Sequence, residues 1–577
     1  MRPPYTRWRA LLCLLLLSWG AAPLYAAPEG QAAGDTVVIT VRDIRRLNLR
    51  SVQELLNHIP GVRAGENSVS IRGSRAVRVL LDGMPLNDRS AHGVKLEMVP
   101  FRQLEKVIVI KGGGGTFYGD YSGGGVIRFI TRRAGRTRTF LELYAGSLEL
   151  RGLRAGISRQ AGAWGLAAGA HYRREQGYRS NNDKEVQRVN LKLSYQPPNR
   201  RSGRGPSLSL DYGERRYGSP GYPRHPTPRA RAHNQSLGAC LRWQGRGLAS
   251  GTFFTRFRNR RTDPDRGIDS VLTTWTLRQD FTRRLELPWL GKLHAGLGLQ
   301  NEHGQGTGLE PRDEQTYALF ALKHLHRGRL GLRLGLRVNL YSAFGTALNP
   351  EARLSWRLGP AQVWAAVSHS NQTPTFRQRY FRHSTLRPNP ALGMERSTNY
   401  GLGLCWSGPA WLKGEVSLFY NQTQDRITFV RGDDGVGQYR NAGRTCLQGL
   451  DASVALRPFP WLEVKPSYTY LEAKDQDTGL WLAGKPRHKL KLEVVLRPRP
   501  GSMLGLHYTY VGRVFTRADN REQGPAYHLV ALRGEYTWGE GWRLFARVDN
   551  LLDQDYLYAD GMPAPPRTWQ VGLGREF

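Results

Sequence analysis

The chain has 577 residues, and its 84 Lys and Arg residues against 47 Asp and Glu give a formal net charge of +37. No run of about twenty apolar residues occurs, which excludes a helical membrane protein. Beyond residue 26 the cysteines are Cys240, Cys405 and Cys446, and this odd number at wide spacing excludes a disulfide framework and a cysteine metal cluster.

The first 26 residues have the pattern of an export signal. Arginines stand near the start, an apolar core runs from Ala10 to Leu17, and Leu24-Tyr25-Ala26 ends in a small residue. We therefore expect residues 1–26 to be cleaved and residues 27–40 to form a periplasmic leader. An exported chain without a spanning helix is secreted, periplasmic or an outer-membrane β-barrel. Such a chain meets anionic lipid headgroups rather than nucleic acid, so we expect no nucleic-acid partner.

The segment Asp35 to Thr40 is extended in pattern. It is followed by Ser51 to His58, a predicted helix with Ser51 at its N-cap and apolar residues at helical spacing. Pro60-Gly61 ends this helix. The two segments indicate a small domain with both strands and helices.

Five glycine-rich or apolar motifs follow between residues 71 and 131. They are Ile71-Arg72-Gly73, Val77 to Gly83, Leu104 to Lys111, Gly112 to Gly115, and Gly123 to Thr131. Short apolar strands that end in glycine turns predict a compact domain with sharp backbone bends. A phosphate-binding loop would need Gly-Lys-(Ser/Thr), and no lysine follows Gly115, so we exclude nucleotide binding.

In their order and spacing these motifs resemble the plug domain of TonB-dependent outer-membrane receptors. The resemblance implies a plug over residues 41–134 inside a transmembrane barrel over residues 135–577. It implies a TonB box too, the segment that adds a strand to the energy-transducing partner. The segment that resembles this box also resembles the first strand of the plug. Either one segment has both roles or the box is degenerate, and we favour the dual role for Asp35, Thr36, Val37, Val38, Ile39 and Thr40.

From about Gly135 onward, apolar and polar residues alternate. Leu330 to Leu340 places leucines and a valine between glycines, arginines and Asn339, and Leu490 to Leu496 alternates in the same way. This pattern predicts an antiparallel transmembrane β-barrel. A soluble sandwich would alternate too, but with shorter strands. At roughly 20 residues per strand and connection, the remaining length allows about 22 strands, and barrels of that width hold a plug.

Long polar connections are expected on the outer side of this barrel. We predict them at Glu214 to Gln235, Arg256 to Gly267 and Asn301 to Thr316. Further similarity to the family's barrel lies in the segments Thr373 to Phe376, Asn389 to Leu392, Glu395 to Tyr400, Tyr439 to Gly443 and Val548 to Tyr556, and in the terminal Phe577.

The resemblance also implies site residues. In the family, plug arginines pair with barrel glutamates, although ordinary solvated lumen charges are the alternative interpretation here. The candidates for this lock are Arg72, Lys111, Glu395 and Asp451. Polar turns at the plug apex, and a histidine at a position where haem receptors carry one, give the ligand-contact candidates Glu66, Asn67, Arg89, Ser90, His92 and His383.

The sequence thus predicts an all-β outer-membrane protein of about 22 strands with an α+β plug. We expect it to import a scarce metal chelate, such as a ferric siderophore or a cobalamin-like molecule. A haem receptor and an uncoupled plugged receptor are alternatives. No catalytic constellation, cofactor site or metal site stands out, so we expect no enzyme. The expected partners are a TonB-type protein, outer-membrane lipids and lipopolysaccharide, the ligand, and the barrel-assembly machinery, with the chain itself a monomer. We expect basic residues to line the vestibule of the barrel, and these residues predict an anionic ligand. They are Arg333, Arg337, Lys465, Lys489 and Lys491 on strands, and Arg224, Arg229 and Arg231 in long loops.

Overall fold

The structure is a computed structural model that describes residues 35–90, 93–135, 137–196, 205–223, 225–245, 247–287, 291–382, 386–432, 436–558 and 561–577. The predicted signal peptide and residues 27–34 lie outside the described residues, as do His92 and His383.

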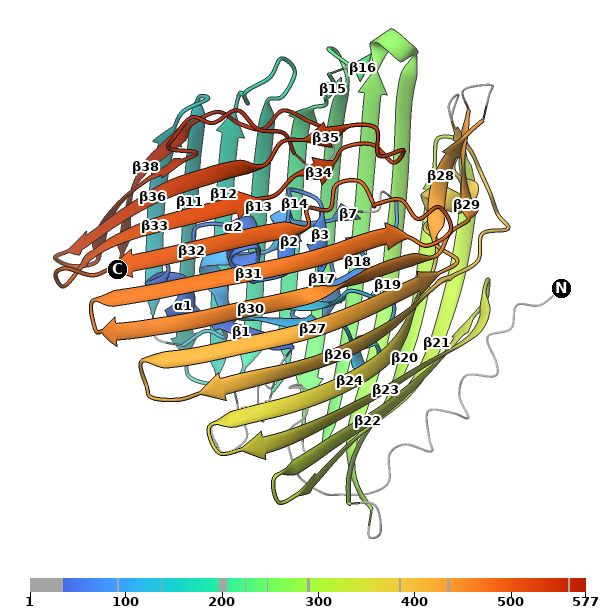
Figure 1. Cartoon of the computed structure of the whole chain (residues 1–577), viewed down its shortest axis with the longest axis horizontal. Coiled ribbons are helices and arrows are strands. Elements are labelled where there is room, and N and C mark those ends of the chain that lie inside the picture. Colours follow the sequence, from blue (N-terminus) through green and yellow to red (C-terminus); the bar gives the residue numbers. More distant parts are fainter. Residues whose placement is uncertain are drawn as a thin grey trace.

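A closed barrel of 22 antiparallel strands forms the wall of the molecule, which confirms the predicted strand number (Figure 1). Each strand pairs with the next barrel strand in the sequence, and β38 pairs back onto β10. The barrel strands are β10 (Arg138–Gly146), β11 (Leu150–Ala161), β12 (Trp164–Glu175), β13 (Lys184–Tyr195), β14 (Ser207–Gly218), β17 (Arg231–Gln244), β18 (Leu248–Asp263), β19 (Ile268–Leu287), β20 (Gly291–Gly306), β21 (Leu309–Arg327), β22 (Leu330–Tyr341), β23 (Gly345–Leu358), β24 (Ala361–Gln372), β26 (Glu395–Ser407), β27 (Leu412–Gln424), β30 (Thr445–Phe459), β31 (Leu462–Asp475), β32 (His488–Leu496), β33 (Ser502–Val511), β36 (Tyr527–Trp538), β37 (Trp542–Asp549) and β38 (Thr568–Glu576).

Side chains alternate between the two faces of the wall, as the sequence predicts. On β22, Leu334 and Leu336 are exposed on the outside, whereas Arg337 and Asn339 are buried on the inside. Successive residues of a strand point to opposite faces, so the apolar set of each strand meets lipid and the polar set lines the lumen.

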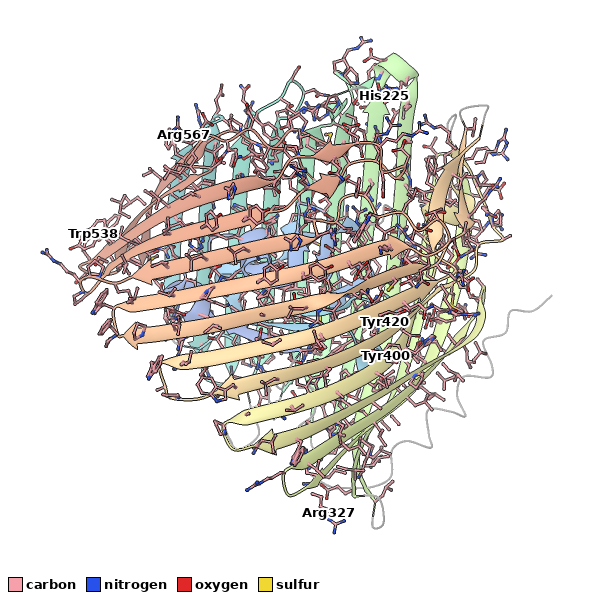
Figure 2. The ribbon with its side chains drawn as sticks, in the orientation of Figure 1. His225, Arg327, Tyr400, Tyr420, Trp538 and Arg567 are labelled. Carbon is pink, nitrogen blue, oxygen red and sulfur yellow. The ribbon has the colours of Figure 1, made fainter. Side chains whose placement is uncertain are left out.

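Exposed tryptophans gather near the end of the barrel with short turns. Aromatic rings of this kind sit at the membrane–water interface, and they fix the level of the barrel in the bilayer. The tryptophans are Trp164, Trp243, Trp356, Trp411, Trp461 and Trp538, and the last of these is labelled in Figure 2. Within the described ranges, no helix has the length and apolar character needed to cross a membrane.

The opposite end carries the long connections and several small elements, some of which are labelled in Figure 1. Barrels of this type place their longer loops outside the cell, so this is the outer end. The elements are β15 (Gly221–Tyr222), β16 (His225–Pro226), η4 (Pro264–Arg266), α4 (Phe376–Tyr380), β25 (Leu386–Arg387), β28 (Ile427–Arg431), β29 (Gly437–Asn441), β34 (Val514–Phe515) and β35 (Gln523–Gly524).

Two of the three predictions of long connections were wrong, namely those at Arg256 to Gly267 and at Asn301 to Thr316. Residues 256–263 continue β18 and pair with β19, and residues 301–306 continue β20 opposite β21, so only short turns remain. These strand ends are polar on both faces, and alternation fades where both faces meet water. The sequence therefore resembled a loop, although the hydrogen-bonded ladder continues.

The plug lies inside the barrel, drawn in blue in Figure 1. Its main sheet has the order β1-β8-β9-β4-β5, in which β4 and β9 are parallel and the other pairs antiparallel. Smaller pairs, β2 with β3 and β6 with β7, complete it. The elements are β1 (Thr36–Thr40), α1 (Val41–Arg46), α2 (Val52–His58), β2 (Val62–Ala64), β3 (Val69–Ile71), β4 (Val77–Leu81), β5 (Met84–Pro85), β6 (Asn87–Asp88), β7 (Gly93–Val94), η1 (Leu96–Met98), η2 (Phe101–Gln103), β8 (Leu104–Lys111), α3 (Gly115–Tyr118) and β9 (Gly125–Thr131).

The helix α2 packs onto this sheet through an apolar core. Leu55, Leu56 and Phe129 are fully buried there. Ser51 is the N-cap, as predicted, and its side chain accepts a hydrogen bond of 3.1 Å from the Glu54 backbone N–H. The cap satisfies one of the free N–H groups of the first turn, and Gly61, at φ +73°, lets the chain turn beyond the helix end.

Replacing Ser51 by Ala tests how much this cap holds α2 in place. Loss of the cap lowers the free energy of local opening of α2 by about 1 kcal/mol. Amide hydrogen exchange through this opening then becomes about fivefold faster. Exchange in purified full-length protein, followed by mass spectrometry, measures the rate. Ser68→Ala, in an exposed plug turn, is the control, and equal α2 rates in the two variants would contradict the expectation.

Candidate functional site

A buried charge cluster joins the plug to the wall at Arg72. The guanidinium donates from Nε to Asp451 Oδ2 at 2.8 Å, and from Nη2 to Asp35 Oδ1 at 2.7 Å and to Ser417 Oγ at 2.6 Å. It also lies over the Phe419 ring, 4.6 Å from the centroid. Ser417, Phe419 and Asp451 belong to the wall, so one plug residue bonds to two wall strands.

Lys111 completes this cluster. Its Nζ lies 3.6 Å from Asp451 Oδ2, and its backbone N–H donates to the Asp35 carbonyl at 2.9 Å. Two cations thus face two carboxylates, all of them buried. Burial lowers the pKa of Arg72, but Asp35 and Asp451 more than offset this effect and the pKa is raised. Arg72 is therefore held charged. Its φ of +49° fixes the direction of the side chain from an uncommon backbone conformation.

The structure brings together three of the four lock candidates and leaves Glu395 outside the cluster. Glu395 instead accepts a hydrogen bond of 2.6 Å from the Ile427 backbone N–H at the outer end of β26. Gly403 is the β26 residue level with Ser417 and Asp451. Glu395 precedes it by eight residues, or roughly 26 Å along the strand. Asp35 and Ser417 take part in its place.

The candidate TonB box is the edge strand of the plug sheet. Thr36 to Thr40 pair with β8, in register from Thr36 opposite Ile110 to Thr40 opposite Lys106. Asp35, just before this strand, is the residue that binds Arg72. The segment therefore forms the first strand of the plug, one of the two roles that the sequence allowed. Its binding to a TonB-type partner stays a prediction.

The plug apex residues are held by the wall. Arg89 is buried, with Nε 3.3 Å from Glu302, Nη2 3.2 Å from Glu314, and Nη1 donating to Thr373 Oγ1 at 2.5 Å. Ser90 donates from Oγ to Asp88 at 2.6 Å. Contact of either residue with a ligand stays a prediction, since these atoms already have partners.

The other apex loop contains Glu66 and Asn67. Glu66 pairs with Lys184 and Arg215, and Asn67 Oδ1 accepts from Arg215 Nη1 at 2.8 Å. Half of the Glu66 side chain stays exposed. This loop is thus the apex segment that remains open to the outer side of the lumen.

Four arginines surround one carboxylate on the inner part of the wall. Glu142 is fully buried on β10, 2.7 Å from Arg154, 3.6 Å from Arg50 and 3.8 Å from Arg102, and it also pairs with Arg543. Burial lowers the pKa of Arg102 to about 9. Glu142 raises this pKa, but the neighbouring Arg543 and Arg50 lower it. Sequence analysis missed this cluster. A lone glutamate among the apolar residues of Phe140 to Tyr144 was its only signal.

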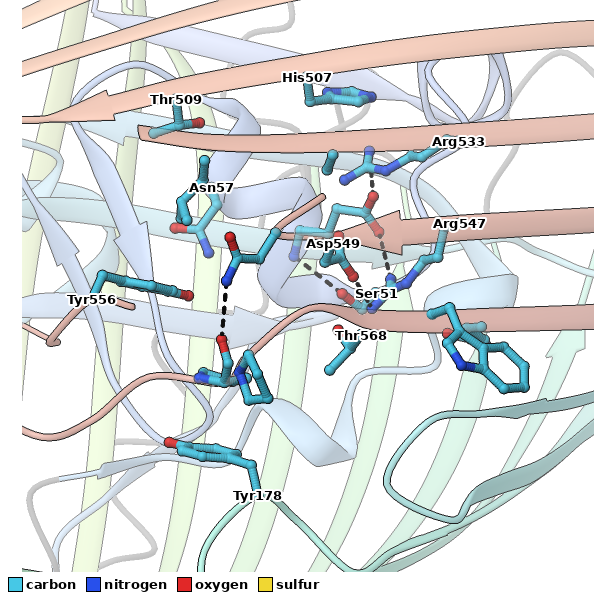
Figure 3. A pocket seen from close by; sticks show the side chains of 18 of the residues that line it. Ser51, Asn57, Tyr178, His507, Thr509, Arg533, Arg547, Asp549, Tyr556 and Thr568 are labelled. Atoms are coloured by element: carbon cyan, nitrogen blue, oxygen red, sulfur yellow. Dashed lines mark hydrogen bonds and ion pairs between the residues drawn. The ribbon is translucent and has the colours of Figure 1, made fainter. Parts of the chain in front are cut away.

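A cavity of about 540 Å³ lies between α2 and the wall (Figure 3). Its volume is that of a typical small-molecule site. Tyr178 and Tyr556 stand at one side of it, and Arg533 and Arg547 at another. The charged lining residues are basic at Arg63, Arg173, Lys184, Lys489, Lys491, Arg533 and Arg547, and acidic at Glu54, Glu175, Glu493 and Asp549.

The acidic side chains of the cavity are already engaged. Glu54 pairs with Arg533 and lies 3.8 Å from Arg547, and these arginines hold its pKa below the usual range despite burial. Glu493 Oε1 lies 2.6 Å from His58 Nδ1. Lys489, by contrast, has no ion-pair partner among the described residues. Basic side chains thus outnumber acidic ones in the lining of the cavity.

His58 in this cavity contacts both Glu493 and Lys465. Burial and Lys465 lower its pKa, although Glu493 raises it, and the net shift favours the neutral ring. A neutral ring with Nδ1–H donating to Glu493 has a lone pair on Nε2, and Lys465 Nζ lies 3.0 Å from that atom. The contacts thus fit a single tautomer that links plug and wall.

Some of the basic residues predicted to line the vestibule are buried in the lumen, and others are paired with carboxylates near the outer end. Arg337 and Lys491 are buried inside the barrel, as predicted. Arg229 in an outer loop pairs with Asp265, and Arg231 at the start of β17 pairs with Asp183, so their charges are offset. Arg224 lies outside the described residues.

Within the described ranges, no group of three or more His, Cys, Asp or Glu is arranged to hold a metal ion.

Two family models match this chain. The TonB-dependent receptor plug domain matches residues 28–126, and the TonB dependent receptor-like β-barrel matches residues 176–551. Solved structures with the same fold include a ferric enterobactin receptor of Pseudomonas aeruginosa in complex with enterobactin, at 18% identity over 94% of this chain and 100% of that chain, with a TM-score of 0.76. The siderophore receptor PirA of Acinetobacter baumannii matches at 16% identity over 94% and 98%, with a TM-score of 0.78. The ferric-catecholate import receptor Fiu of Escherichia coli K12 matches at 16% over 96% and 99%, with a TM-score of 0.76.

Replacing Arg72 by Gln tests the lock. It leaves Asp35 and Asp451 buried with Lys111 alone, and removing one partner of a buried pair costs about 3–5 kcal/mol. We expect faster hydrogen exchange in β1 and β8 and a higher ion conductance of the protein in planar bilayers. Arg42→Gln, at an exposed position of α1, is the control. Exchange and conductance equal to those of the parent would mean that the cluster does not hold the plug.

Proposed function

The chain belongs to the TonB-dependent receptor family of the Gram-negative outer membrane, and we propose that it imports an anionic metal chelate into the periplasm. A TonB-type partner in the inner membrane supplies the energy. The observation that carries this proposal is the positively charged cavity between α2 and the wall, which reaches from the outer loops at Tyr178 and Tyr556 to Arg533 beside the plug.

The closed lumen supports energised import rather than free diffusion. Ion pairs of the plug with the wall stand on several sides, including Arg72 with Asp451, Arg89 with Glu314 and Lys192 with Asp82. Breaking buried pairs of this kind is costly. Asp35 bonds to Arg72 and directly precedes β1. A pull on β1 would therefore act first on the Arg72 cluster.

The charge of the cavity supports an anionic cargo. Seven basic side chains line it against four acidic ones. A concave site lined by one sign of charge concentrates solutes of the opposite sign. The tyrosines Tyr178, Tyr527, Tyr556 and Tyr558 add aromatic surface. The solved structures of a ferric enterobactin receptor and of a ferric-catecholate import receptor have the same fold, and they give weaker support for an anionic cargo.

An uncoupled surface receptor is the second candidate. One observation favours it. The candidate TonB box is strand β1 of the plug sheet, paired with β8, and is therefore not a free segment. The backbone of this strand distinguishes the two candidates. Asp35 and Lys111 form a hydrogen-bonded pair, because the Lys111 N–H donates to the Asp35 carbonyl. Bonded pairs alternate in an antiparallel ladder, so the Val37 N–H faces β8 and the Val38 N–H faces the free edge of the sheet.

Val38→Pro tests coupling. Proline removes the N–H on the free edge, which a partner strand would use, and leaves the bonds to β8 in place. We expect ligand binding to remain and uptake by whole cells to be lost. Val37→Pro is the matched control, since it removes a ladder bond and loosens the plug itself. Unchanged uptake in Val38→Pro would support the uncoupled receptor.

The charge of the cargo is tested with two simple iron complexes. Tris(catecholato)iron(III) is a trianion, and tris(acetohydroxamato)iron(III) is neutral. We expect the purified protein to bind the trianion in preference, more weakly at high salt. Removal of the Lys489 amine, a donor available to a bound anion, in Lys489→Gln should weaken this binding about tenfold. Arg229→Gln, on an outer loop, is the control. Equal binding of the two complexes at both salt concentrations would rule out an anionic cargo.

A further inference from the structure

Two pairs of tyrosines face outward on the wall near its outer end. They are Tyr468 and Tyr470 on β31, and Tyr508 and Tyr510 on β33. The residues between and beside them face inward. Thr469 donates to Asp451 at 2.9 Å, and His507 lies 3.9 Å from Glu493. Because faces alternate along a strand, all four tyrosines point to the lipid side.

Each pair holds a histidine of the next strand. His488 opens β32 and His528 lies at the start of β36, and both are exposed. The His488 ring centroid lies 6.3 Å from Tyr468 and 5.4 Å from Tyr470. The His528 centroid lies 5.9 Å from Tyr508 and 5.0 Å from Tyr510. The same arrangement thus occurs twice on adjacent hairpins, and we call each one a tyrosine–histidine clamp.

The hydrogen bonds within the two clamps are also the same. Tyr468 Oη lies 2.8 Å from His488 Nδ1, and Tyr508 Oη lies 2.7 Å from His528 Nδ1. When a phenol donates to Nδ1, the ring carries its hydrogen on Nε2. Neither Nε2 has a partner within the described ranges. With the phenols assigned as donors, each clamp leaves one N–H donor on an exposed histidine ring.

The charge around the first clamp is positive. Arg487, exposed just before His488, donates from Nη2 to Tyr470 Oη at 3.4 Å and lies over the Trp481 ring at 4.4 Å. The nearby carboxylate of Glu472 is 2.6 Å from Lys474, so its charge is offset. The guanidinium of Arg487 is left as the net charge beside the clamp.

We propose that the two tyrosine–histidine clamps bind the phosphate groups of an outer-leaflet lipid. An N–H donor that faces lipid is costly without an acceptor. At the level of the strand ends, the acceptors available from the membrane are headgroup oxygens, and phosphate binds both arginine and N–H donors well. This assignment rests on the outer-membrane location of the barrel and not on the identity of its cargo.

The opposite end of the barrel shows what aromatic anchoring looks like in this protein without such a site. There Tyr536 stacks on Trp538 at 5.8 Å, and Phe459 stacks on Trp461 at 5.2 Å. These rings contact one another and present apolar faces to the lipid. The clamps differ because each one fixes an imidazole by a hydrogen bond.

The double change His488→Phe with His528→Phe tests the proposal, because it keeps two rings and removes both N–H donors. The full-length protein in detergent is titrated with lipid A carrying two phosphates and with the same lipid after dephosphorylation, and native mass spectrometry measures the bound fraction. We expect the parent to prefer the phosphorylated lipid, and the double variant to bind it at least about tenfold more weakly. Equal binding of the two lipids by the parent would overturn the proposal.

Two further measurements keep the result clear. Tyr536→Phe, at the short-turn end, is the matched control and should bind like the parent. We expect Arg487→Gln to weaken binding while both clamp histidines stay in place, so it applies even where the double variant does not fold. A double variant that folds and binds phosphorylated lipid like the parent would overturn the proposal. So would a dimer that forms through this surface in the absence of lipid and is lost in the double variant, since the occupant would then be a second copy of the chain.

Discussion

The polar inner face of the barrel is the constraint from which the rest of the structure follows. A closed wall satisfies its own backbone, and alternation turns its apolar side chains to the lipid. The plug therefore contacts the wall through charged side chains, as at Arg72 with Asp451 and Arg89 with Glu314. An apolar patch of the wall that includes Phe253 and Phe257 also packs into the plug core. A buried charge is stable only beside its partner. The plug is thus held firmly while every pair is in place, and pairs can be broken one at a time.

The two flanks of the plug differ in their charge balance. Around Arg72, two cations meet two carboxylates, and a serine completes the hydrogen bonds. Beside α2, basic side chains exceed acidic ones, Lys489 stands without an ion-pair partner among the described residues, and a cavity remains. One flank is therefore suited to holding the plug. The other is suited to receiving an anion, and the Glu142 cluster continues the positive charge toward the inner end of the wall.

The features that depend on local sequence could be predicted. Alternation predicts the barrel and the chain length predicts its strand number. The N-cap at Ser51 and the apolar spacing predict α2, and the resemblance of the glycine motifs predicts the plug. Features set by register across many strands could not. Glu395 is far from Arg72 because it lies eight residues from Gly403 along β26, and Asp35 joins the cluster because β1 pairs with β8 in one register. The cavity depends on how α2 packs beside five or more wall strands, and the sequence of no single segment predicts that packing.

The pairing of β10 with β38 has a consequence for how the protein is made. This seam closes the wall between strands from opposite ends of the barrel sequence, and Glu142 on β10 lies beside it, bound to Arg50 and Arg102 of the plug. Until β38 joins it, β10 has an open edge, which is prone to pairing with other chains. Contacts of Glu142 with the plug arginines would keep that edge near the plug, so the plug would favour closure of the wall within one chain.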